Sequence, residues 1–539
     1  MKIFLYIVML VAFFGLMIAI GFKFRKKSRS TDGFLLGGRN VGAWLTAFAY
    51  GTSYFSAVVF VGYAGQFGHR FGIASTWIGI GNAVIGSLLA WVILGRRTRL
   101  MTRRLKSATM SDFFGKRFDS KALKIAAAII IFVFLIPYTA SLYNGLSRLF
   151  AMAFEIPFWV CIIIMSVLTA IYVIAGGYMA TAVNDFIQGM IMLFGIVAVI
   201  VAVILTKGGW NQIFIDLSAV NDANVSAQQG VFASFFGPDA ISLFFVIILT
   251  SLGTWGLPQM VQKFYAIKDE SAIVKGTIIS TLFAVVVAGG CYFLGGFARL
   301  YPVELLPNGK PNYDSVIPAM LSELSPVLIG LVIILVLSAS MSTLSSLTMT
   351  SASTVTLDLI KPARKNPLTE KQEVLWIRGL IVVFIIVSGA LAYAQYRFNI
   401  VLIAQMMAVS WGALAGAFLA PFLYGLYSKT TTKAAVWFSY IYGVGVMVLY
   451  LLYVLWLKNY FTLPAFFSSP LNLGALVMLS DLIFVPLISL FTKKPNQEKV
   501  DQIFACYNTT AVVTAKEVLV DIDEQEDKTE IAAETDKTN

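Results

Sequence analysis

Apolar stretches of about 20 residues recur along almost the whole chain, and short polar segments separate them. Because a helix needs about 20 mainly apolar residues to cross roughly 30 Å of hydrocarbon, each stretch predicts a transmembrane helix. Thirteen are predicted, at residues 3–23, 41–66, 73–95, 122–151, 157–176, 183–206, 239–262, 273–297, 326–355, 376–395, 398–425, 433–457 and 469–491. The first runs directly into basic residues and lacks a convincing small-residue cleavage site, which favours a retained helix over a signal peptide.

The composition is that of an all-α polytopic membrane protein. Of the 539 residues, 58% are hydrophobic and 13% are charged, and the mean hydropathy is +0.81, values that a soluble globular protein does not have. The three cysteines suggest no disulfide framework, and the single histidine, His69, cannot build a metal site. No sequence motif for catalysis occurs in a supporting context, so the chain is not expected to be an enzyme.

Basic residues concentrate in the loops after the first, third and ninth predicted helices. They are Lys23, Arg25, Lys26, Lys27 and Arg29, then Arg96, Arg97, Arg99, Arg103, Arg104 and Lys106, then Lys361, Arg364, Lys365 and Lys371. The positive-inside rule assigns these loops to the cytoplasm, which predicts an outside N-terminus and an inside C-terminus. The net charge of +12 reflects this bias and contact with anionic lipid, and a nucleic-acid partner is not expected.

Two predicted helices contain residues that interrupt a helix. The second has Gly51-Thr52-Ser53 at its centre, and the seventh has Gly253, Gly256 and Pro258 close together. Both segments are predicted to unwind within the membrane, with an ordinary kink as the alternative. The two breaks lie five helices apart, so helices 2–6 and 7–11 form two five-helix halves of opposite orientation. Paired broken helices in such an inverted repeat indicate the central site of a transporter.

This pattern divides the chain into six parts. Residues 1–40 supply an extra helix and a basic cytoplasmic loop, 41–206 the first repeat, 207–238 an extracellular loop, 239–425 the second repeat, 426–492 two peripheral helices, and 493–539 a cytoplasmic tail. The tail carries eleven acidic and six basic residues and is predicted to be largely disordered, although residues 511–522 could fold locally.

Hydroxyl groups crowd the second half of the ninth helix, in residues 331–358. Ala339, Ser342, Thr343 and Ser346 are spaced i, i+3, i+4 and i+7 and share one face, with Ser345 beside it. Such hydroxyls commonly join helices within a bilayer by hydrogen bonds. The alternative is a set of oxygen ligands for a small hard cation such as Na⁺.

Five further charged residues lie within or beside the predicted helices. Asp185 is either a cap or interface residue or a functional intramembrane carboxylate, and Asp481 is interpreted as a contact with a neighbouring helix. Asp239 and Asp358 are expected to be caps or interfacial charges, and Arg148 is expected to extend to the lipid headgroups.

Several segments match one known family in order and spacing. They are FLLGGRNVG (34–42), GTSYFSA (51–57), AGGYMATAVNDFIQG (175–189), GLPQMVQKF (256–264), SASMSTLSSLTMTSASTVTLD (338–358) and AVSWGALAGAFLAP (408–421). Through about residues 5–490 the chain resembles the sodium:solute symporter family, which includes bacterial proline and pantothenate transporters. The resemblance implies a leucine-transporter-type 5+5 inverted repeat, with one extra helix before the ten-helix core and two after it.

The resemblance also implies where Na⁺ would bind. The sodium site that family members share corresponds to backbone carbonyls of Thr52, Phe55 and Ala339 and to the hydroxyls of Ser342 and Thr343. A second site, present in some members, corresponds to Asp185, Ser342, Ser345 and Ser346. The residues leave the number of coupled ions open.

Near the two breaks, the chain departs from the proline transporters. It has Tyr54 where they carry an aspartate and GLP (256–258) where they carry GQP, which resembles the pantothenate branch. The solute is expected against Tyr54, Ser56, Val59, Trp255 and Gln259, with Trp255 either a gate or ordinary packing. With no lone cation expected in the core, a solute carboxylate would be held by half-helix N-termini.

The expected function is sodium-coupled import, by alternating access, of a small organic solute such as pantothenate, proline, another amino acid or a monocarboxylate. The expected location is the plasma membrane, in a bacterium the cytoplasmic membrane, with the bilayer, Na⁺ and the solute as partners. One alternative is proton coupling, with Asp185 titrating. Another is a transporter-like sensor, although the tail is too short to hold a kinase or receiver domain. The solute, the ion stoichiometry and the oligomeric state stay open.

Overall fold

The computed structural model describes residues 2–24, 30–305, 309, 311–398 and 403–508. Across these ranges the chain is helical, and strand-like pairing is limited to the isolated bridges Val41–Ile267 and Leu305–Pro311. Arg25, Lys26, Lys27 and Arg29 of the predicted basic loop lie outside the described residues, as do 511–522 of the tail.

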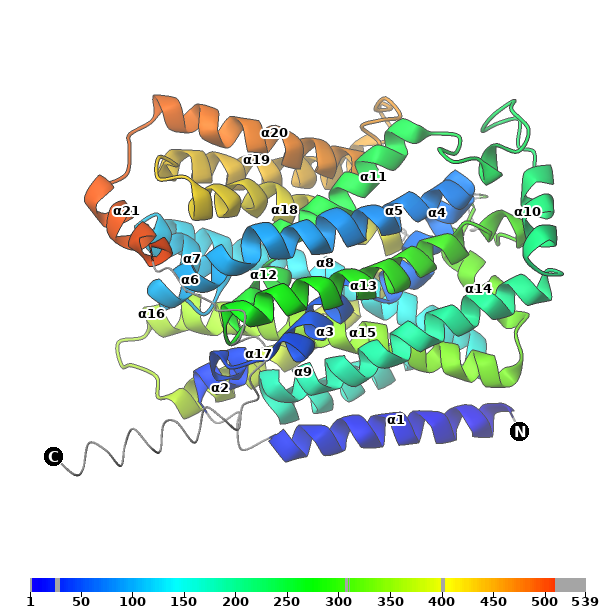
Figure 1. Ribbon diagram of the computed structural model, residues 1–539, viewed down its shortest axis with the longest axis horizontal. Coiled ribbons are helices and arrows are strands. Elements are labelled where there is room, and N and C mark those ends of the chain that lie inside the picture. The colour runs from blue at the N-terminus through cyan, green and yellow to red at the C-terminus, as the bar shows by residue number, and fades with distance from the viewer. Residues whose placement is uncertain (1, 25–29, 306–308, 310, 399–402, 509–539) are drawn as a thin grey trace.

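Long helices run side by side along the horizontal axis of Figure 1, and short helices gather at both ends. The long elements are α1 (Lys2–Phe24), α8 (Lys121–Phe154), α9 (Phe158–Thr206), α13 (Glu270–Gly295), α15 (Pro326–Thr354), α17 (Glu370–Phe398), α18 (Ile403–Tyr427), α19 (Lys433–Leu452) and α20 (Pro470–Phe491). The broken or shorter ones are α3 (Ala43–Tyr54), η3 (Val58–Tyr63), α4 (Ala64–Phe71), α5 (Thr76–Gly81), η5 (Asn82–Leu89), α6 (Arg96–Arg104), α11 (Ala240–Leu252), η8 (Gly253–Gly256) and α12 (Pro258–Tyr265). At the ends lie α2 (Thr31–Leu36), α7 (Met110–Arg117), α10 (Trp210–Ala219), η10 (Tyr313–Ser315), α14 (Val316–Ser322), η11 (Val355–Ile360), α16 (Lys361–Ala363) and α21 (Gln497–Phe504).

Helical structure follows the predicted apolar segments. Within the described ranges, ten helices are long and apolar enough to cross a membrane, or eleven if α11 and α12 form one bent span. Gly177 (φ 60°) interrupts α9, and the apolar helix Phe158–Ile171 before it is shorter than the others. The count of thirteen and the sidedness of the termini therefore stay predictions.

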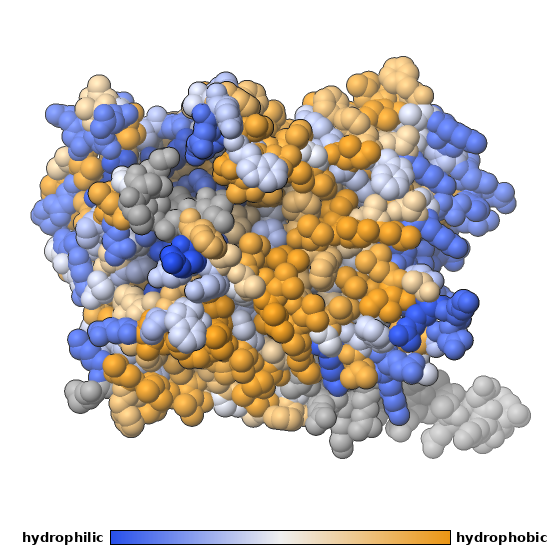
Figure 2. All heavy atoms as spheres, turned by 180° about the vertical axis from the view of Figure 1, so that it is seen from behind, coloured by the Kyte–Doolittle hydropathy of each residue, from blue (hydrophilic) through white to orange (hydrophobic). Residues whose placement is uncertain are grey.

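The surface agrees with insertion in a bilayer. Figure 2 shows apolar side chains over the middle of the molecule and hydrophilic ones toward both ends. Exposed Ile, Val, Leu and Phe side chains lie on α1, α13, α17 and α20, where a soluble protein would carry polar residues. The apolar middle is the part that would face lipid.

The break in the seventh predicted helix is confirmed. After α11, residues Gly253–Gly256 form a 3-10 turn and Leu257 is extended (φ −83°, ψ 121°). Pro258 then occupies the first position of α12, where its missing N–H is not needed. The axes of the two parts differ by 47°.

The break in the second predicted helix lies later than predicted. Gly51, Thr52 and Ser53 are helical, α3 runs to Tyr54, and the extended residue is Phe55 (φ −105°, ψ 110°). A single glycine within a helix is destabilising by only about 1 kcal/mol. At Gly51 it provides room, because a Cβ there would lie 2.5 Å from the Phe283 ring. Gly51 therefore marks a close helix contact, and the predicted position of the break was wrong.

Two of the charged residues behave as predicted. Asp239 caps α11, accepting from the Ser242 N–H, and pairs with Arg70 at 2.7 Å. Asp481 accepts a hydrogen bond from Ser439, which joins α20 to α19.

Two others require correction. Asp358 is buried and accepts hydrogen bonds from Thr109 (2.6 Å) and Ser111 (2.5 Å) at the start of α7. Because η11 packs against α8, the Lys124 ammonium also lies 2.9 Å from its carboxylate. Arg148 does not extend to headgroups, since its guanidinium lies 3.7 Å from the buried carboxylate of Asp314. Both charges pair within the protein instead of meeting the interface.

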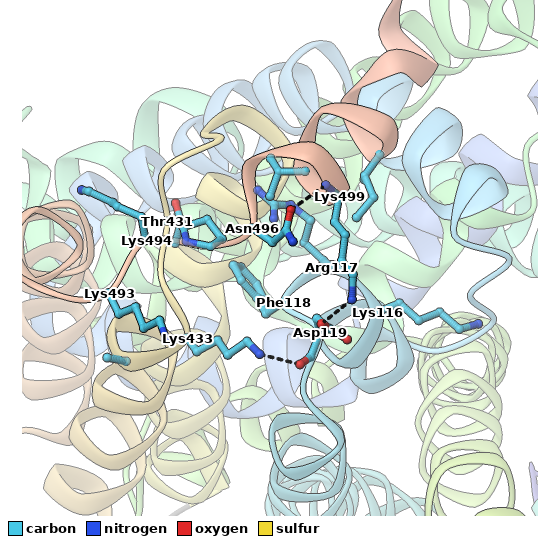
Figure 3. Close-up of a pocket in the computed structure, with 14 residues that line it drawn as sticks. Lys116, Arg117, Phe118, Asp119, Thr431, Lys433, Lys493, Lys494, Asn496 and Lys499 are labelled. Carbon is cyan, nitrogen blue, oxygen red and sulfur yellow. Dashed lines mark hydrogen bonds and ion pairs between the residues drawn. The ribbon is translucent and has the colours of Figure 1, made fainter.

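The described first part of the tail contains the helix α21 (Gln497–Phe504), while most of the segment predicted to be largely disordered lies outside the described residues. Val500 and Phe504 of α21 are buried, and the Arg117 guanidinium lies 4.9 Å from the Phe504 ring centre. Lys499 pairs with Asp119 at 3.0 Å across a cavity of about 420 Å³ (Figure 3). The hydrogen bond and charge of Lys499 hold the pKa of the Asp119 carboxyl below its ordinary value.

Close helix packing gives a test of the fold. A Cβ at Gly68 of α4 would lie 1.7 Å from the carbonyl oxygen of Gly295 in α13. Gly68→Ala should therefore lower the unfolding temperature, by the equivalent of about 1–3 kcal/mol for an overpacked contact. Thermal unfolding of the purified protein in detergent measures this. Gly289→Ala, where a Cβ meets nothing within 4 Å, is the control and should leave the unfolding temperature unchanged or higher. Equal effects would contradict the packing of α4 on α13.

Candidate functional site

Oxygen atoms converge where α15 passes the end of α3. The Ser342 hydroxyl lies 2.9 Å from the Thr52 carbonyl oxygen and 3.1 Å from that of Ala339. The Thr343 hydroxyl lies 3.3 Å from the Thr52 carbonyl and 3.1 Å from that of Ala339. Four of the five residues predicted for the shared sodium site therefore meet. Together with Ser53, whose carbonyl also contacts Thr343, they form a group that we call the oxygen cluster: Thr52, Ser53, Ala339, Ser342 and Thr343.

Ser53 and Phe55 differ from the expectation. The Ser53 carbonyl lies 3.3 Å from the Thr343 hydroxyl and joins the cluster, although the sequence did not point to it. Phe55 lies in the break, its N–H donates to the Gly51 carbonyl at 3.2 Å, and no described contact joins it to Ser342 or Thr343. The displaced break explains this, because α3 continues to Tyr54 and Phe55 is the extended residue after it.

The donor set of the oxygen cluster fits a small hard cation. It consists of three carbonyls and two hydroxyls, all neutral and all buried. Hard cations take oxygen ligands, and the last-turn carbonyls of a helix carry its negative dipole end. Thr52 and Ser53 belong to the last turn of α3, so their carbonyls have lost the helical partners that the break removed. The cluster can therefore coordinate Na⁺, with α3 and α15 each supplying ligands.

Asp185 lies beside a cationic side chain, Lys263, that was not predicted from the sequence. Asp185 of α9 is fully buried, and the Lys263 ammonium lies 4.0 Å from its carboxylate. The same ammonium donates to the Ser346 hydroxyl at 2.9 Å, and Ser346 contacts Ser53 at 2.8 Å. Asp185 is thus neither a cap nor an interface residue. Lys263 is paired with Asp185, so it is not a lone cation in the core.

The bend between α11 and α12 explains why Lys263 was missed. The seventh apolar segment ends at residue 262, so the next charge looked like a boundary residue. In the structure the 47° bend turns α12 inward, and Lys263 stays 4% exposed. The Tyr178 ring lies 5.3 Å below its ammonium. A lysine one helical turn and a half after the proline of the break was the available signal.

Only two of the four residues predicted for the second sodium site come together in the described structure. The Ser345 hydroxyl donates to the Ser342 carbonyl of its own helix at 2.8 Å. The Ser342 hydroxyl belongs to the oxygen cluster. Asp185 and Ser346 are therefore the two members that meet, and they meet at Lys263.

Aromatic rings gather between the two breaks. The Tyr54 ring stacks on Phe55 with centres 4.3 Å apart and lies 6.3 Å from Trp411 of α18. Tyr138 of α8 lies 5.9 Å from the same indole. The Tyr54 hydroxyl donates to the Thr250 carbonyl of α11 at 2.5 Å, so one side chain links the two broken helices.

The other residues predicted for the solute lie around these breaks. The Trp255 indole N–H donates to the Ile85 carbonyl of η5 at 3.0 Å, so the ring is anchored to a neighbouring helix. Ser56 lies in the first break, where its hydroxyl accepts from the Val58 N–H at 3.3 Å. Val59 is buried in η3 directly after it.

Gln259 carries the clearest binding signal among the predicted solute residues. It is 1% exposed, and neither its amide nitrogen nor its amide oxygen has a hydrogen-bond partner in the described structure. Such a buried group is destabilising by about 1–3 kcal/mol unless something pairs with it. The Tyr138 hydroxyl lies near both the Trp411 indole N–H and the Ser56 hydroxyl of the first break. Tyr138 and Trp411 were not predicted at this site, because an aromatic residue in an apolar helix is ordinarily packing.

Comparison with known proteins identifies the family. The model of the sodium:solute symporter family matches residues 34–445. The chain belongs to this family. It is therefore a multi-pass membrane transporter of the sodium-coupled solute type and not an enzyme.

Individual relatives agree with this assignment. The sodium/proline symporter of Staphylococcus aureus is 26% identical over 498 residues, covering 90% of this chain and 93% of that protein. The sodium/proline symporter of strain JH9 is 27% identical over 499 residues, with the same coverage. A structure of a Na⁺-coupled sialic acid symporter, substrate-bound and outward-open, has a TM-score of 0.72 at 16% identity, covering 91% of this chain and 98% of that one. The leucine-transporter-type fold is thereby confirmed.

The oxygen cluster gives the next prediction. Ser342→Ala and Thr343→Ala each remove one hydroxyl that faces α3, and we expect apparent Na⁺ affinity to fall about tenfold or more, because hydrogen bonds and ligands to charged groups contribute about 1.5–3 kcal/mol. Na⁺-dependent thermal stabilisation of the purified protein measures this.

Ser340→Ala is the matched control for both variants. The Ser340 hydroxyl is buried on the same helix and donates to the Val336 carbonyl of that helix at 2.8 Å. Its Na⁺ response should equal that of the parent. If Ser342→Ala and Thr343→Ala also respond like the parent, the hydroxyls only join the helices.

Proposed function

We propose that this transporter imports a small organic solute together with Na⁺ by alternating access around the two helix breaks. The observation that carries the proposal is the oxygen cluster, in which carbonyls at the end of α3 meet hydroxyls of α15. The proposed ligands are Thr52, Ser53, Ala339, Ser342 and Thr343, with Phe55 directly after them at the break.

The position of the cluster supplies a route for coupling. Ser53 is followed directly by Tyr54 and Phe55, whose stacked rings enter the aromatic group between the breaks. A cation held by the Thr52 and Ser53 carbonyls would fix the end of α3 and thereby the Tyr54 ring. Two ligands that favour the same arrangement bind more tightly together than apart.

The solute proposed is a small carboxylate or amino acid, with pantothenate, proline and monocarboxylates as the candidates. The rings of Tyr54, Tyr138 and Trp411 offer an apolar wall, and the Gln259 amide offers one donor and one acceptor. The start of α12 provides N–H groups and a positive dipole end that suit a carboxylate. Relatives named sodium/proline symporter make proline a first candidate, whereas Tyr54 and GLP at 256–258 favour pantothenate.

Transport into proteoliposomes tests the proposal. Labelled proline, pantothenate and a monocarboxylate are offered under an inward Na⁺ gradient, an inward proton gradient, or neither. We expect one solute to accumulate only with the Na⁺ gradient, and the plasma membrane as the site of transport in cells. Accumulation that follows the proton gradient alone would replace Na⁺ coupling by proton coupling at Asp185. Solute binding without transport would favour a sensor.

Gln259 provides a test of the solute site. Gln259→Leu removes an unpaired buried amide, so solute affinity should fall about tenfold while Na⁺-dependent stabilisation stays unchanged. Binding of labelled solute to the purified protein measures this. Gln262→Leu, one turn later, is the control, because its amide oxygen already accepts from Thr350 at 2.8 Å. Loss of solute affinity in Gln262→Leu alone would contradict the assignment.

Variants of Trp255 distinguish a gating role for this ring from ordinary packing. Trp255→Ala removes the ring beside the second break and should reduce solute affinity more than Na⁺ affinity, because the oxygen cluster lies on α3 and α15. Trp255→Phe keeps a ring but loses the hydrogen bond to Ile85 and should have the smaller effect on solute affinity. Unchanged solute affinity in Trp255→Ala would assign the ring to packing.

A further inference from the structure

Lys263 occupies a position where a transporter of this kind could hold a mobile cation. Its side chain is 5% exposed, in the last turn of the eight-residue helix α12. The ammonium donates to the Ser346 hydroxyl at 2.9 Å and lies 4.0 Å from the Asp185 carboxylate. It therefore sits among the oxygens that a second Na⁺ would need.

Asp185 has no other compensation in the part of the chain that the structure describes. Both carboxylate oxygens are buried and lack a hydrogen-bond donor, and the Lys263 ammonium is the cation that lies within ion-pair distance of them. A buried carboxylate without a countercharge is strongly unfavourable, so an ionised Asp185 requires a cation beside it. The protein supplies that cation itself, as the side-chain ammonium of Lys263.

The surrounding residues do not fit a second Na⁺ in addition to the ammonium. Ser345 donates to its own helix, and Ser342 belongs to the oxygen cluster. Asp185 and Ser346 are left, and the Lys263 nitrogen lies at both. A further cation placed there would have two side-chain ligands and a positive charge beside it.

We propose that the Lys263 ammonium takes the place of a second Na⁺, so that this transporter binds and carries one Na⁺ per cycle. The inference rests on the proposed function and adds its ion stoichiometry. Because the ammonium belongs to a side chain of α12, this charge stays with the protein when the Na⁺ leaves.

The location also gives Lys263 a structural effect on the Na⁺ site. From Lys263 the contacts continue through Ser346 to Ser53, whose carbonyl is in the oxygen cluster. The fixed charge thus connects α12, beyond the second break, with the end of α3 before the first. Residues of α9, α12, α15 and α3 meet at this point, in the central part of Figure 1.

Equilibrium binding of ²²Na⁺ to the purified full-length protein tests the proposal without knowledge of the solute. The parent should bind one Na⁺ per chain. Lys263→Ala frees Asp185 and Ser346 and should bind two, and the double variant Lys263→Ala/Asp185→Asn should return to one. Lys263→Arg keeps the tethered charge and should also bind one.

Stability provides a second readout, because Lys263→Ala leaves Asp185 buried without its partner. That variant should be less stable than the parent in K⁺, and Na⁺ should raise its unfolding temperature more steeply than that of the parent. The neutral pair Lys263→Met/Asp185→Asn should fold and bind one Na⁺, which covers the case in which Lys263→Ala does not fold.

Three results separate the possible failures. Two Na⁺ per parent chain would overturn the inference and leave the proposed function in place. One Na⁺ in a folded Lys263→Ala would also overturn it, because the vacated position would then not accept the ion. No Na⁺ bound by the parent would instead contradict the proposed function itself.

Discussion

The structure depends on how two interrupted helices satisfy their backbone at membrane depth. A carbonyl that loses its helical partner in hydrocarbon costs several kcal/mol unless protein or an ion replaces the bond. At the end of α3 the hydroxyls of Ser342 and Thr343 take that role for Thr52. This requirement explains why a helix rich in hydroxyls lies in the middle of the bundle. It also explains why the same oxygens suit Na⁺, since both a hydroxyl proton and a cation compensate a carbonyl dipole.

A second constraint is the compensation of buried charge. Asp185 and Lys263 are each almost fully buried, and the charge of each compensates the charge of the other. The pair at Asp358 and Lys124 and the pair at Asp314 and Arg148 follow the same rule farther along the helices. These three buried pairs are each matched within the protein, whereas the oxygen cluster consists of neutral ligands.

Much of this arrangement could be predicted from the sequence, because it depends on local patterns. Apolar segment lengths gave the helices, Gly253 and Pro258 gave the second break, and the i, i+3, i+4 spacing gave Ser342 and Thr343 a common face. Tertiary contacts decided the rest. Gly51 stays helical because Phe283 packs on it, and Lys263 is buried because α12 bends inward. The sequence of a single segment does not show which ring packs against it or in which direction it bends.

The central claim is that Na⁺ binds at the end of α3 and orders the break that follows. Hydrogen–deuterium exchange tests it directly, by comparing the purified protein in Na⁺ and in K⁺ at equal ionic strength. Na⁺ should slow exchange of the amides at residues 52–57, which surround the break, while the α19 amides far from the cluster exchange equally in both salts. Identical exchange at residues 52–57 in the two salts would contradict the account.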